Sequence, residues 1–198
     1  MLLDRTSPAP EVSSVAVDDV AGAAMAVDHL LELGHRHIAF LNGPDTIKQC
    51  VDRRAGVTRA LVAAGLDPAT ALHEVVVPSL NADGGEQGAS RLLEAFPERR
   101  RPTALFCVND LTAMGAMRTL RWGHGLDIPG DIAVVGYDDV SFAAMLTTPL
   151  TSVRQPTHRL GSVAADLLLR AAGPDDAPAE QVVFQPELVV RASSGPPR

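Results

Sequence analysis

The stretch TALFCVNDLTAMGAMRTLRWG, residues 103–123, carries the pattern that decides the fold. Residues 104–108 are apolar throughout, which is typical of a strand buried on both faces of a parallel sheet. From Asp110 to Trp122 apolar residues recur at helical spacing, and Gly123 ends that run. A buried strand followed at once by an amphipathic helix predicts an α/β fold.

The same alternation extends outward in both directions along the chain. We expect further strands at residues 15–17, 37–41, 74–77, 132–135, 182–184 and 188–190. Amphipathic helices are expected between them, at residues 20–33, 52–64, 85–96 and 157–172. This order predicts an open, mainly parallel sheet with helices on both faces.

Polar residues follow three of the predicted strands. They are Asn42, the pair Asn109-Asp110, and the pair Asp138-Asp139. Ligands of open α/β sheets bind outside the carboxyl ends of the strands, so these positions predict a binding site. The alternative is that Asp110 and Asp139 only cap the helices that follow them.

Composition limits the class of protein. A chain of 198 residues forms one large domain or two small lobes, and 46% apolar residues exclude wholesale disorder. The net charge of −7 argues against a basic DNA-binding face. Cys50 and Cys107 are too few and too far apart for a disulfide scaffold or a structural zinc site. Without a membrane-length apolar stretch or the basic start of a signal peptide, a cytoplasmic location is expected.

The common signatures of enzymes are missing. The sequence has no G-x-S-x-G elbow, Walker loop or G-x-G-x-x-G motif. His35 and His37 lack a third metal ligand nearby and are interpreted as surface or capping residues. The run Arg99–Arg101 before Pro102 is interpreted as a solvated loop. We therefore expect no catalytic residue, no metal and no cofactor, although Asp138 or Asp139 as a general base is the enzymatic alternative.

Four segments, in this order and spacing, resemble the lac-repressor (LacI/GalR-type) family of transcriptional regulators. They are VDHLLELGHRHIAF (27–40), NDLTAMGA (109–116), IPGDIAVVGYDD (128–139) and PLTSVRQP (149–156). The similarity is to the effector-binding region of that family and covers nearly the whole chain. It implies a periplasmic-binding-protein-like fold, in which two lobes with parallel sheets hold a small ligand in the cleft between them.

The resemblance also implies domain boundaries. Residues 1–34 and 154–176 would form the N-terminal lobe, residues 35–153 and 177–192 the C-terminal lobe, and residues 193–198 a frayed tail. The family's helix-turn-helix, its hinge helix and the first units of its N-terminal lobe have no counterpart in this sequence. The chain is therefore expected to be N-terminally truncated, with an incomplete N-terminal lobe.

The positions that contact ligand in the family correspond to six residues of this sequence: Arg53, Asn109, Asp138, Gln155, Asp4 and Arg5. The arginine belongs to the motif RRAGV, residues 53–57, and Gln155 would lie near the hinge. Asp and Asn side chains exchange hydrogen bonds with hydroxyls, and Arg presents a rigid fork of donors. The set therefore suits a small polar ligand, although Leu80 stands where the family usually carries an aromatic residue.

By this resemblance the chain is the ligand-sensing part of a transcriptional regulator. Its effector would be a sugar-like metabolite, it would act as a homodimer, and operator DNA would be bound only through a missing N-terminal domain. No membrane partner is expected. The alternative function is a periplasmic-type solute-binding protein for sugar uptake. Neither the effector, the operator nor the choice between induction and corepression can be deduced from the sequence.

Overall fold

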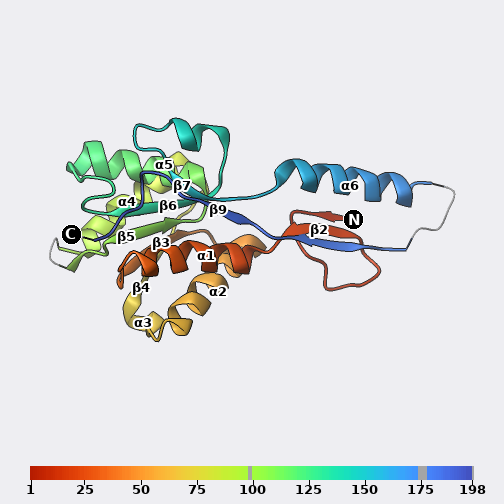
Figure 1. Ribbon diagram of the computed structural model, residues 1–198, viewed down its shortest axis with the longest axis horizontal. Helices are drawn as coiled ribbons and strands as arrows, with labels where there is room; N and C mark the ends of the chain where they lie inside the picture. Colours follow the sequence, from red (N-terminus) through yellow and green to blue (C-terminus); the bar gives the residue numbers. More distant parts are fainter. Residues whose placement is uncertain (98–99, 174–177, 198) are drawn as a thin grey trace.

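The computed structural model describes residues 1–97, 100–173 and 178–197, which form a large lobe and a small lobe (Figure 1). The large lobe contains a six-stranded sheet in the order β4-β3-β5-β6-β7-β9. All neighbouring strands are parallel except β9, which runs antiparallel to β7. The strands are β3 (Ile38–Asn42), β4 (Leu72–Val76), β5 (Ala104–Cys107), β6 (Ala133–Asp138), β7 (Thr151–Arg154) and β9 (Glu187–Val189).

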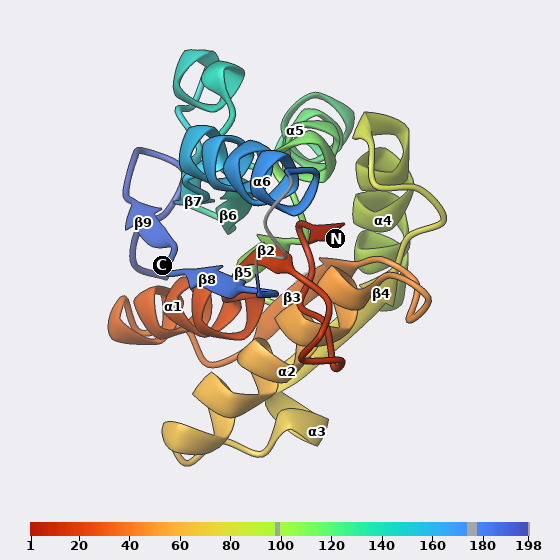
Figure 2. The same cartoon turned by 90° about the vertical axis from the view of Figure 1, so that its right-hand side faces the viewer.

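Helices cover both faces of this sheet, as the sequence predicted (Figure 2). On one face lie α1 (Asp19–Glu32) and α2 (Lys48–Ala63), and on the other lie α4 (Ala82–Ala95) and α5 (Asp110–Arg118). A short helix, α3 (Pro68–Ala71), precedes β4. Within the described ranges, no helix combines the length and apolar composition needed to cross a bilayer.

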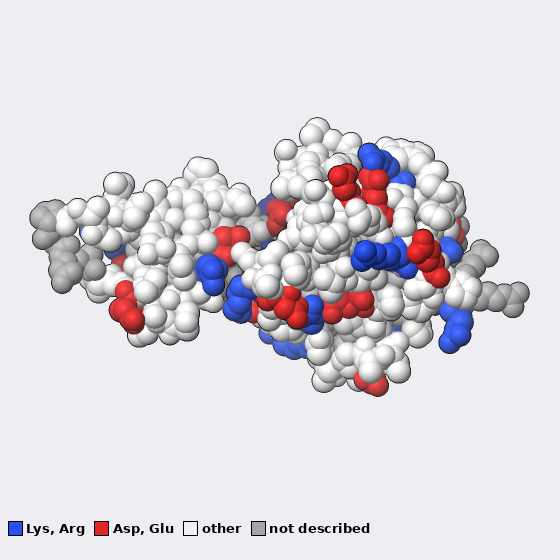
Figure 3. All heavy atoms as spheres, turned by 180° about the vertical axis from the view of Figure 1, so that it is seen from behind, with Lys and Arg blue, Asp and Glu red and all other residues white. Residues whose placement is uncertain are grey.

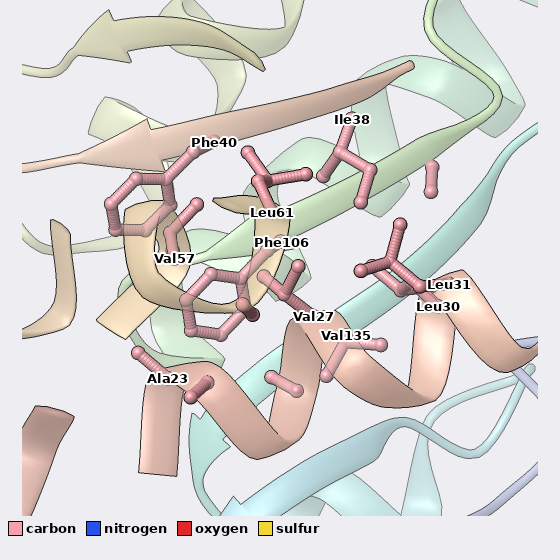
Figure 4. Close-up of a cluster of buried hydrophobic side chains, with 14 of the residues drawn as sticks. Ala23, Val27, Leu30, Leu31, Ile38, Phe40, Val57, Leu61, Phe106 and Val135 are labelled. Carbon is pink, nitrogen blue, oxygen red and sulfur yellow. The ribbon is translucent and has the colours of Figure 1, made fainter. Parts of the chain in front are cut away.

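The two cores of the large lobe follow from the alternation of side chains along each strand. Phe40 and Phe106 point toward α1 and α2, where their rings stack with centroids 4.9 Å apart (Figure 4). Their chain neighbours Leu41 and Leu105 point toward α4 and α5. All four side chains are fully buried, and burying each contributes about 1.5–3 kcal/mol.

The small lobe is a three-stranded parallel sheet with one helix packed on it. Its order is β1-β2-β8, with β1 (Leu2–Leu3), β2 (Ser14–Val17) and β8 (Gln181–Phe184). The helix α6 (Thr157–Ala171) buries Leu160 and Leu167 against Val15 and Val17 of β2. This core is much smaller than either core of the large lobe.

The chain passes between the lobes at three places. The first is Asp18, between β2 and α1, the second is residues 155–156, between β7 and α6, and the third is residues 185–186, between β8 and β9. These crossovers bring residues distant in the sequence to the boundary of the two lobes (Figure 1).

The predicted boundary at residue 34 is wrong, because α1 belongs to the large lobe. Its apolar residues, including Val27 and Leu30, are fully buried in the core with Phe40 and Phe106. The contact with α2 is close, since a Cβ added to Gly56 would stand 2.2 Å from the carbonyl oxygen of Val20. The helical pattern shows that α1 buries a face, but it does not show against which sheet.

Two predictions about the C-terminal part also need correction. Residues 177–192 were expected in the large lobe, but β8 pairs with β2 of the small sheet and only β9 joins the large one. Residue 177 itself lies outside the described residues. The tail is not frayed at its start: Ser193 is fully buried, donates to the carbonyl of Val134 at 2.6 Å and accepts from the amide of Thr151 at 2.8 Å. Arg198 is outside the described range.

Candidate ligand-binding site between the lobes

Arg53 is the centre of a polar cluster at the carboxyl ends of the large sheet. Only 5% of the residue is exposed. Its Nε lies 2.8 Å from Oδ1 of Asp19 in the first turn of α1, and its Nη1 donates to the carbonyl oxygen of Val108 after β5. The guanidinium carbon stands 3.6 Å from the centre of the Tyr137 ring. Helix α1 and the ends of β5 and β6 therefore fix one buried cation.

Asp138, the last residue of β6, faces this cation and a crossover. Its Oδ1 lies 4.0 Å from Nη2 of Arg53 and accepts a hydrogen bond of 2.6 Å from Nε2 of Gln155. The backbone φ of Asp138 is +104°, a region that non-glycine residues rarely adopt and that is associated with functional sites. Two of the predicted ligand-contacting residues, Asp138 and Gln155, are thus hydrogen-bonded to each other, and Gln155 lies in the crossover between β7 and α6.

Burial dominates the electrostatics of this cluster. It raises the pKa of Asp138 and of Asp19, and the neighbouring Arg53 opposes both shifts. Burial acts to lower the pKa of Arg53, but the adjacent Asp19, Tyr137 and Asp138 raise it overall, so the guanidinium stays charged. Arg53 is therefore a fixed cation between the carboxylates of Asp19 and Asp138, whose charged forms are destabilised by burial. These groups can exchange hydrogen bonds with a polar ligand.

Asn109 lies beside this cluster, one residue after Val108. Its Oδ1 accepts from the amide of Thr112 at 2.8 Å and so caps α5, and its Nδ2 donates to the carbonyl oxygen of Leu80 at 3.0 Å. Asn109 therefore lies at the expected end of the sheet, but both the oxygen and the nitrogen of its side-chain amide already bond to backbone groups of the protein.

The predicted Asp4-Arg5 pair is split. Asp4, at φ +58°, accepts hydrogen bonds from Nε2 of Gln49 at its carbonyl oxygen (2.7 Å) and at Oδ2 (3.1 Å). Because Gln49 is in the first turn of α2, this contact joins the small lobe to the large one. Arg5 is exposed and makes no hydrogen bond or ion pair with any described residue, so the structure does not bring it to the cluster.

Sequence reasoning missed Asp19, Tyr137 and Gln49. Asp18-Asp19 directly follows the predicted strand at 15–17, which is the same signal that selected Asn109 and Asp138, but this pair is not among the predicted site residues. Asp18 is the cap, since it accepts from the amide of Ala21 at 2.8 Å. Tyr137 points inward from β6 and is fully buried. No spacing rule identifies Gln49.

Asp139 does not provide the second carboxylate of an acid–base pair. It forms ion pairs with Arg154 at 2.7 Å and with Arg191 at 2.6 Å. Burial acts to raise its pKa, but these two arginines outweigh burial and lower it. Asp139 therefore holds β6, β7 and the segment after β9 together, while Asp138 faces the cluster.

The residues described contain no group of three or more His, Cys, Asp or Glu side chains placed to hold a metal ion. The two cysteines are free and buried, and burial raises the pKa of both thiols. The chemistry available in the cluster is therefore hydrogen bonding and charge.

A fold of two α/β lobes with polar side chains gathered at the crossovers defines a class of ligand-binding protein. The family model of the periplasmic binding protein-like domain matches residues 27–194. The regulator MalR of Streptomyces coelicolor is 37% identical over 196 residues, which are 98% of this chain and 55% of that protein.

Solved structures of similar fold are also transcriptional regulators. The transcriptional regulator CelR in complex with cellobiose has a TM-score of 0.85 and 34% identity, over 94% of this chain and 55% of CelR. A LacI-family regulator of Enterococcus faecium with bound ribose has a TM-score of 0.88 and 28% identity, over 98% of this chain and 69% of that one. This chain belongs to the periplasmic-binding-protein-like family, as an effector-binding domain of the LacI/GalR type. The chain spans about half the length of the curated relative MalR.

Proposed function

We propose that this chain is the effector-sensing domain of a DNA-binding regulator and that it binds a sugar between its lobes. Arg53, Asn109, Asp138, Gln155 and Asp4 would contact the ligand, whereas the position of Arg5 gives that residue no support. In the related CelR and Enterococcus structures the bound molecules are cellobiose and ribose. The class of ligand is therefore a polyhydroxylated metabolite.

The observation that carries this proposal is the Arg53–Asp138–Gln155 arrangement. Gln155 lies in a crossover and its amide is bonded to Asp138, 4.0 Å from the guanidinium of Arg53. A sugar hydroxyl donates to a carboxylate and accepts from a guanidinium, so it replaces bonds that these side chains now make with one another. Because one partner is in the hinge, ligand binding changes the relative stability of open and closed lobes.

The consequence for DNA binding is indirect. Closure of the lobes biases a homodimer between operator-competent and incompetent states, and a separate N-terminal domain contacts the operator. We place the protein in the cytoplasm, where that DNA is. The net charge of −7 predicts that this chain alone does not retard operator DNA in a gel, and specific retardation would contradict the assignment.

Calorimetry with cellobiose, ribose, maltose and galactose tests the proposed ligand. For the sugar that binds, Asp138→Ala should weaken binding by roughly 1–3 kcal/mol, because hydrogen bonds to the ligand are lost and the amide of Gln155 is left without its partner. Asp166→Asn, an exposed carboxylate on α6, is the matched control and should bind as the wild type does. Equal affinities of both variants would refute the site. Binding to none of the sugars would refute the proposed class of ligand.

The homodimer would form through an apolar face of the large lobe. A pocket of about 230 Å³ is lined by Met114, Met117, Ile128 and Leu146, and Trp122 at its rim is 69% exposed. Met145, beside Leu146, is 73% exposed. Met145→Asp should lower the dimer fraction in sedimentation experiments, whereas Val62→Asp on α2 should not. A wild-type monomer at high protein concentration would rule this surface out.

Sugar uptake remains the second candidate. MalR, CelR and the Enterococcus faecium relative are all regulators, which favours sensing over transport. The gene sequence upstream decides between the two: a helix-turn-helix supports the regulator, and a signal peptide supports the transport protein.

A further inference from the structure

The guanidinium of Arg53 has few hydrogen-bond donors left for a ligand. Its Nε donates to Oδ1 of Asp19 at 2.8 Å, and its Nη1 donates to the carbonyl oxygen of Val108. Arginine holds a carboxylate or a phosphate group most strongly when two of its nitrogens donate side by side. The two pairs that can do so are Nε with Nη2 and Nη1 with Nη2, and each includes a nitrogen that the protein already binds.

The guanidinium is also fixed in its plane, so it cannot turn to offer another edge. Its carbon lies 3.6 Å from the centre of the Tyr137 ring, and Tyr137 is fully buried. That ring is in turn held by α1, because a Cβ added to Gly22 would stand 2.4 Å from the Tyr137 hydroxyl oxygen. Turning Arg53 would leave the buried carboxylate of Asp19 unpaired, which is strongly destabilising.

The remaining nitrogen, Nη2, faces carboxylates. Among the described residues none accepts a hydrogen bond from it, and Oδ1 of Asp138 lies 4.0 Å away. Asp4 of the small lobe is near this point, because its charge acts to raise the pKa of both Asp138 and Asp19. Within the described chain, Oδ2 of Asp138 and Oδ1 of Asp4 accept no hydrogen bond. These free oxygens are acceptors, so they need a ligand that donates hydrogen.

We propose that the site accepts uncharged sugars and rejects sugar acids and sugar phosphates. This inference rests on the proposed function and narrows its class of ligand. A hydroxyl group donates its hydrogen to the carboxylate of Asp138 while its oxygen accepts from Nη2 of Arg53. A carboxylate or a doubly ionised phosphate group has no hydrogen to donate, and it meets the charges of Asp138 and Asp4 at close range. Arg53 therefore contacts a single hydroxyl group and does not clamp an anion.

Pairs of sugars that differ in one charged group test the proposal. Calorimetry at constant ionic strength and about pH 7.5 compares ribose with ribose 5-phosphate, galactose with galacturonate, and maltose with maltose 6′-phosphate. Where the neutral sugar binds, its anionic partner should bind at least about tenfold more weakly, because like charges oppose binding. An anion that binds as tightly as its neutral partner would overturn this inference and leave the sugar site standing. If no sugar binds, the proposed function fails and this inference fails with it.

Two variants separate the arrangement around Arg53 from the overall negative charge. Asp138→Asn removes the carboxylate that faces Nη2 and should narrow the difference between neutral and anionic sugars to less than about threefold. Asp52→Asn removes the same charge one residue before Arg53, where the carboxylate pairs with Lys48 instead, and should leave the difference unchanged. An unchanged difference in Asp138→Asn, or equal narrowing by both variants, would contradict the proposal.

Inorganic phosphate gives a test that needs no sugar. The Nε–H signal of Arg53 can be identified in NMR spectra by its proximity to Tyr137, the one tyrosine of the sequence. We expect this signal to stay in place when phosphate is added to about 20 mM at constant ionic strength, because the edge that would bind the anion is already used. A saturable shift would show that anions reach the guanidinium, and it would overturn the inference whether or not any sugar binds.

Discussion

The large and small lobes are built from the same strand–helix unit, yet they bury their apolar residues to very different extents. In the large lobe Leu41 and Leu105 are completely inaccessible to solvent. In the small lobe Leu168 is 58% exposed and Leu169 is 73% exposed on α6, and Val183 is 47% exposed on β8. Charged side chains spread over the visible face of the large lobe but are sparse on that of the small lobe (Figure 3).

The alternating pattern of strands and helices thus makes a closed core only where helices cover both faces of a sheet. Four helices flank the large sheet, whereas among the described residues α6 is the helix that packs on the small one. A groove of about 380 Å³, lined by Leu3, Ala164 and Leu168 among others, remains open between α6 and β1. Stability should therefore be concentrated in the large lobe.

The largest effect should come from the core of the large lobe. Phe106→Ala removes one ring of the stacked pair and should lower the free energy of unfolding by about 3–5 kcal/mol. Leu169→Ala, in the small lobe, should change it by less than about 0.5 kcal/mol, because that side chain is mostly in water. Urea denaturation of both variants measures the contrast, and comparable losses would show that the lobes are equally well packed.

The second effect concerns a buried carboxylate in the large lobe. Asp110 is fully buried, accepts from Ser152 Oγ at 2.6 Å and from the amide of Val140 at 2.9 Å, and has no cation partner in the described chain. Burial raises its pKa to about 7. The folded state therefore prefers the protonated acid, so its contribution is fully present below about pH 4 and is lost as the pH rises through 7.

The loss is at most about 4 kcal/mol, because a shift of one pKa unit corresponds to about 1.4 kcal/mol and the helix N-terminus of α5 partly compensates the charge. Asp110→Asn keeps the shape and abolishes the titration. The difference in unfolding free energy between variant and wild type should grow in favour of the variant from pH 5 to pH 8. A difference that is constant with pH would mean that Asp110 is ionised throughout.

The smallest effect should be on the contact that joins the lobes. Gln49→Ala removes both hydrogen bonds to Asp4 and should destabilise the small lobe by about 0.5–1.5 kcal/mol. Amide hydrogen exchange should accelerate in β1 and β2 and stay unchanged in β3 and β5. Gln87→Ala, exposed on α4, is the control. Acceleration in both lobes would show that they unfold as one unit.

The central strands β3, β5 and β6 of the large lobe could be predicted because they are buried on both faces and are therefore almost entirely apolar. The pattern around 104–107 is of this kind. The strand β7 was not predicted, because its sequence TSVR contains polar residues. Thr151 and Ser152 are nevertheless fully buried, and their hydroxyls bond to the segment after β9 and to Asp110, respectively. Lobe membership was mispredicted for α1 and β8, since it depends on long-range pairing that local periodicity does not contain.

The candidate site divides in the same way. Asp138 was selected because it follows a strand at its carboxyl end, and in the structure it lies beside Arg53. Arg53 itself was indicated by the motif RRAGV and not by its position relative to a strand. The same rule, applied to the end of the strand at 15–17, also selects Asp19, which is the second carboxylate beside Arg53. Arg5 follows Asp4 in the chain, but at this turn the two side chains have different surroundings.

The three crossovers have a consequence for the integrity of the molecule. Neither lobe is a continuous stretch of chain, because each is assembled from segments that leave and return. A single backbone cleavage at any one crossover leaves the lobes tethered by the other two, and the fragments remain interlocked through β2–β8 pairing on one side and β7–β9 pairing on the other. A nicked molecule therefore keeps its sheets, while neither lobe can be excised as a continuous fragment of the gene.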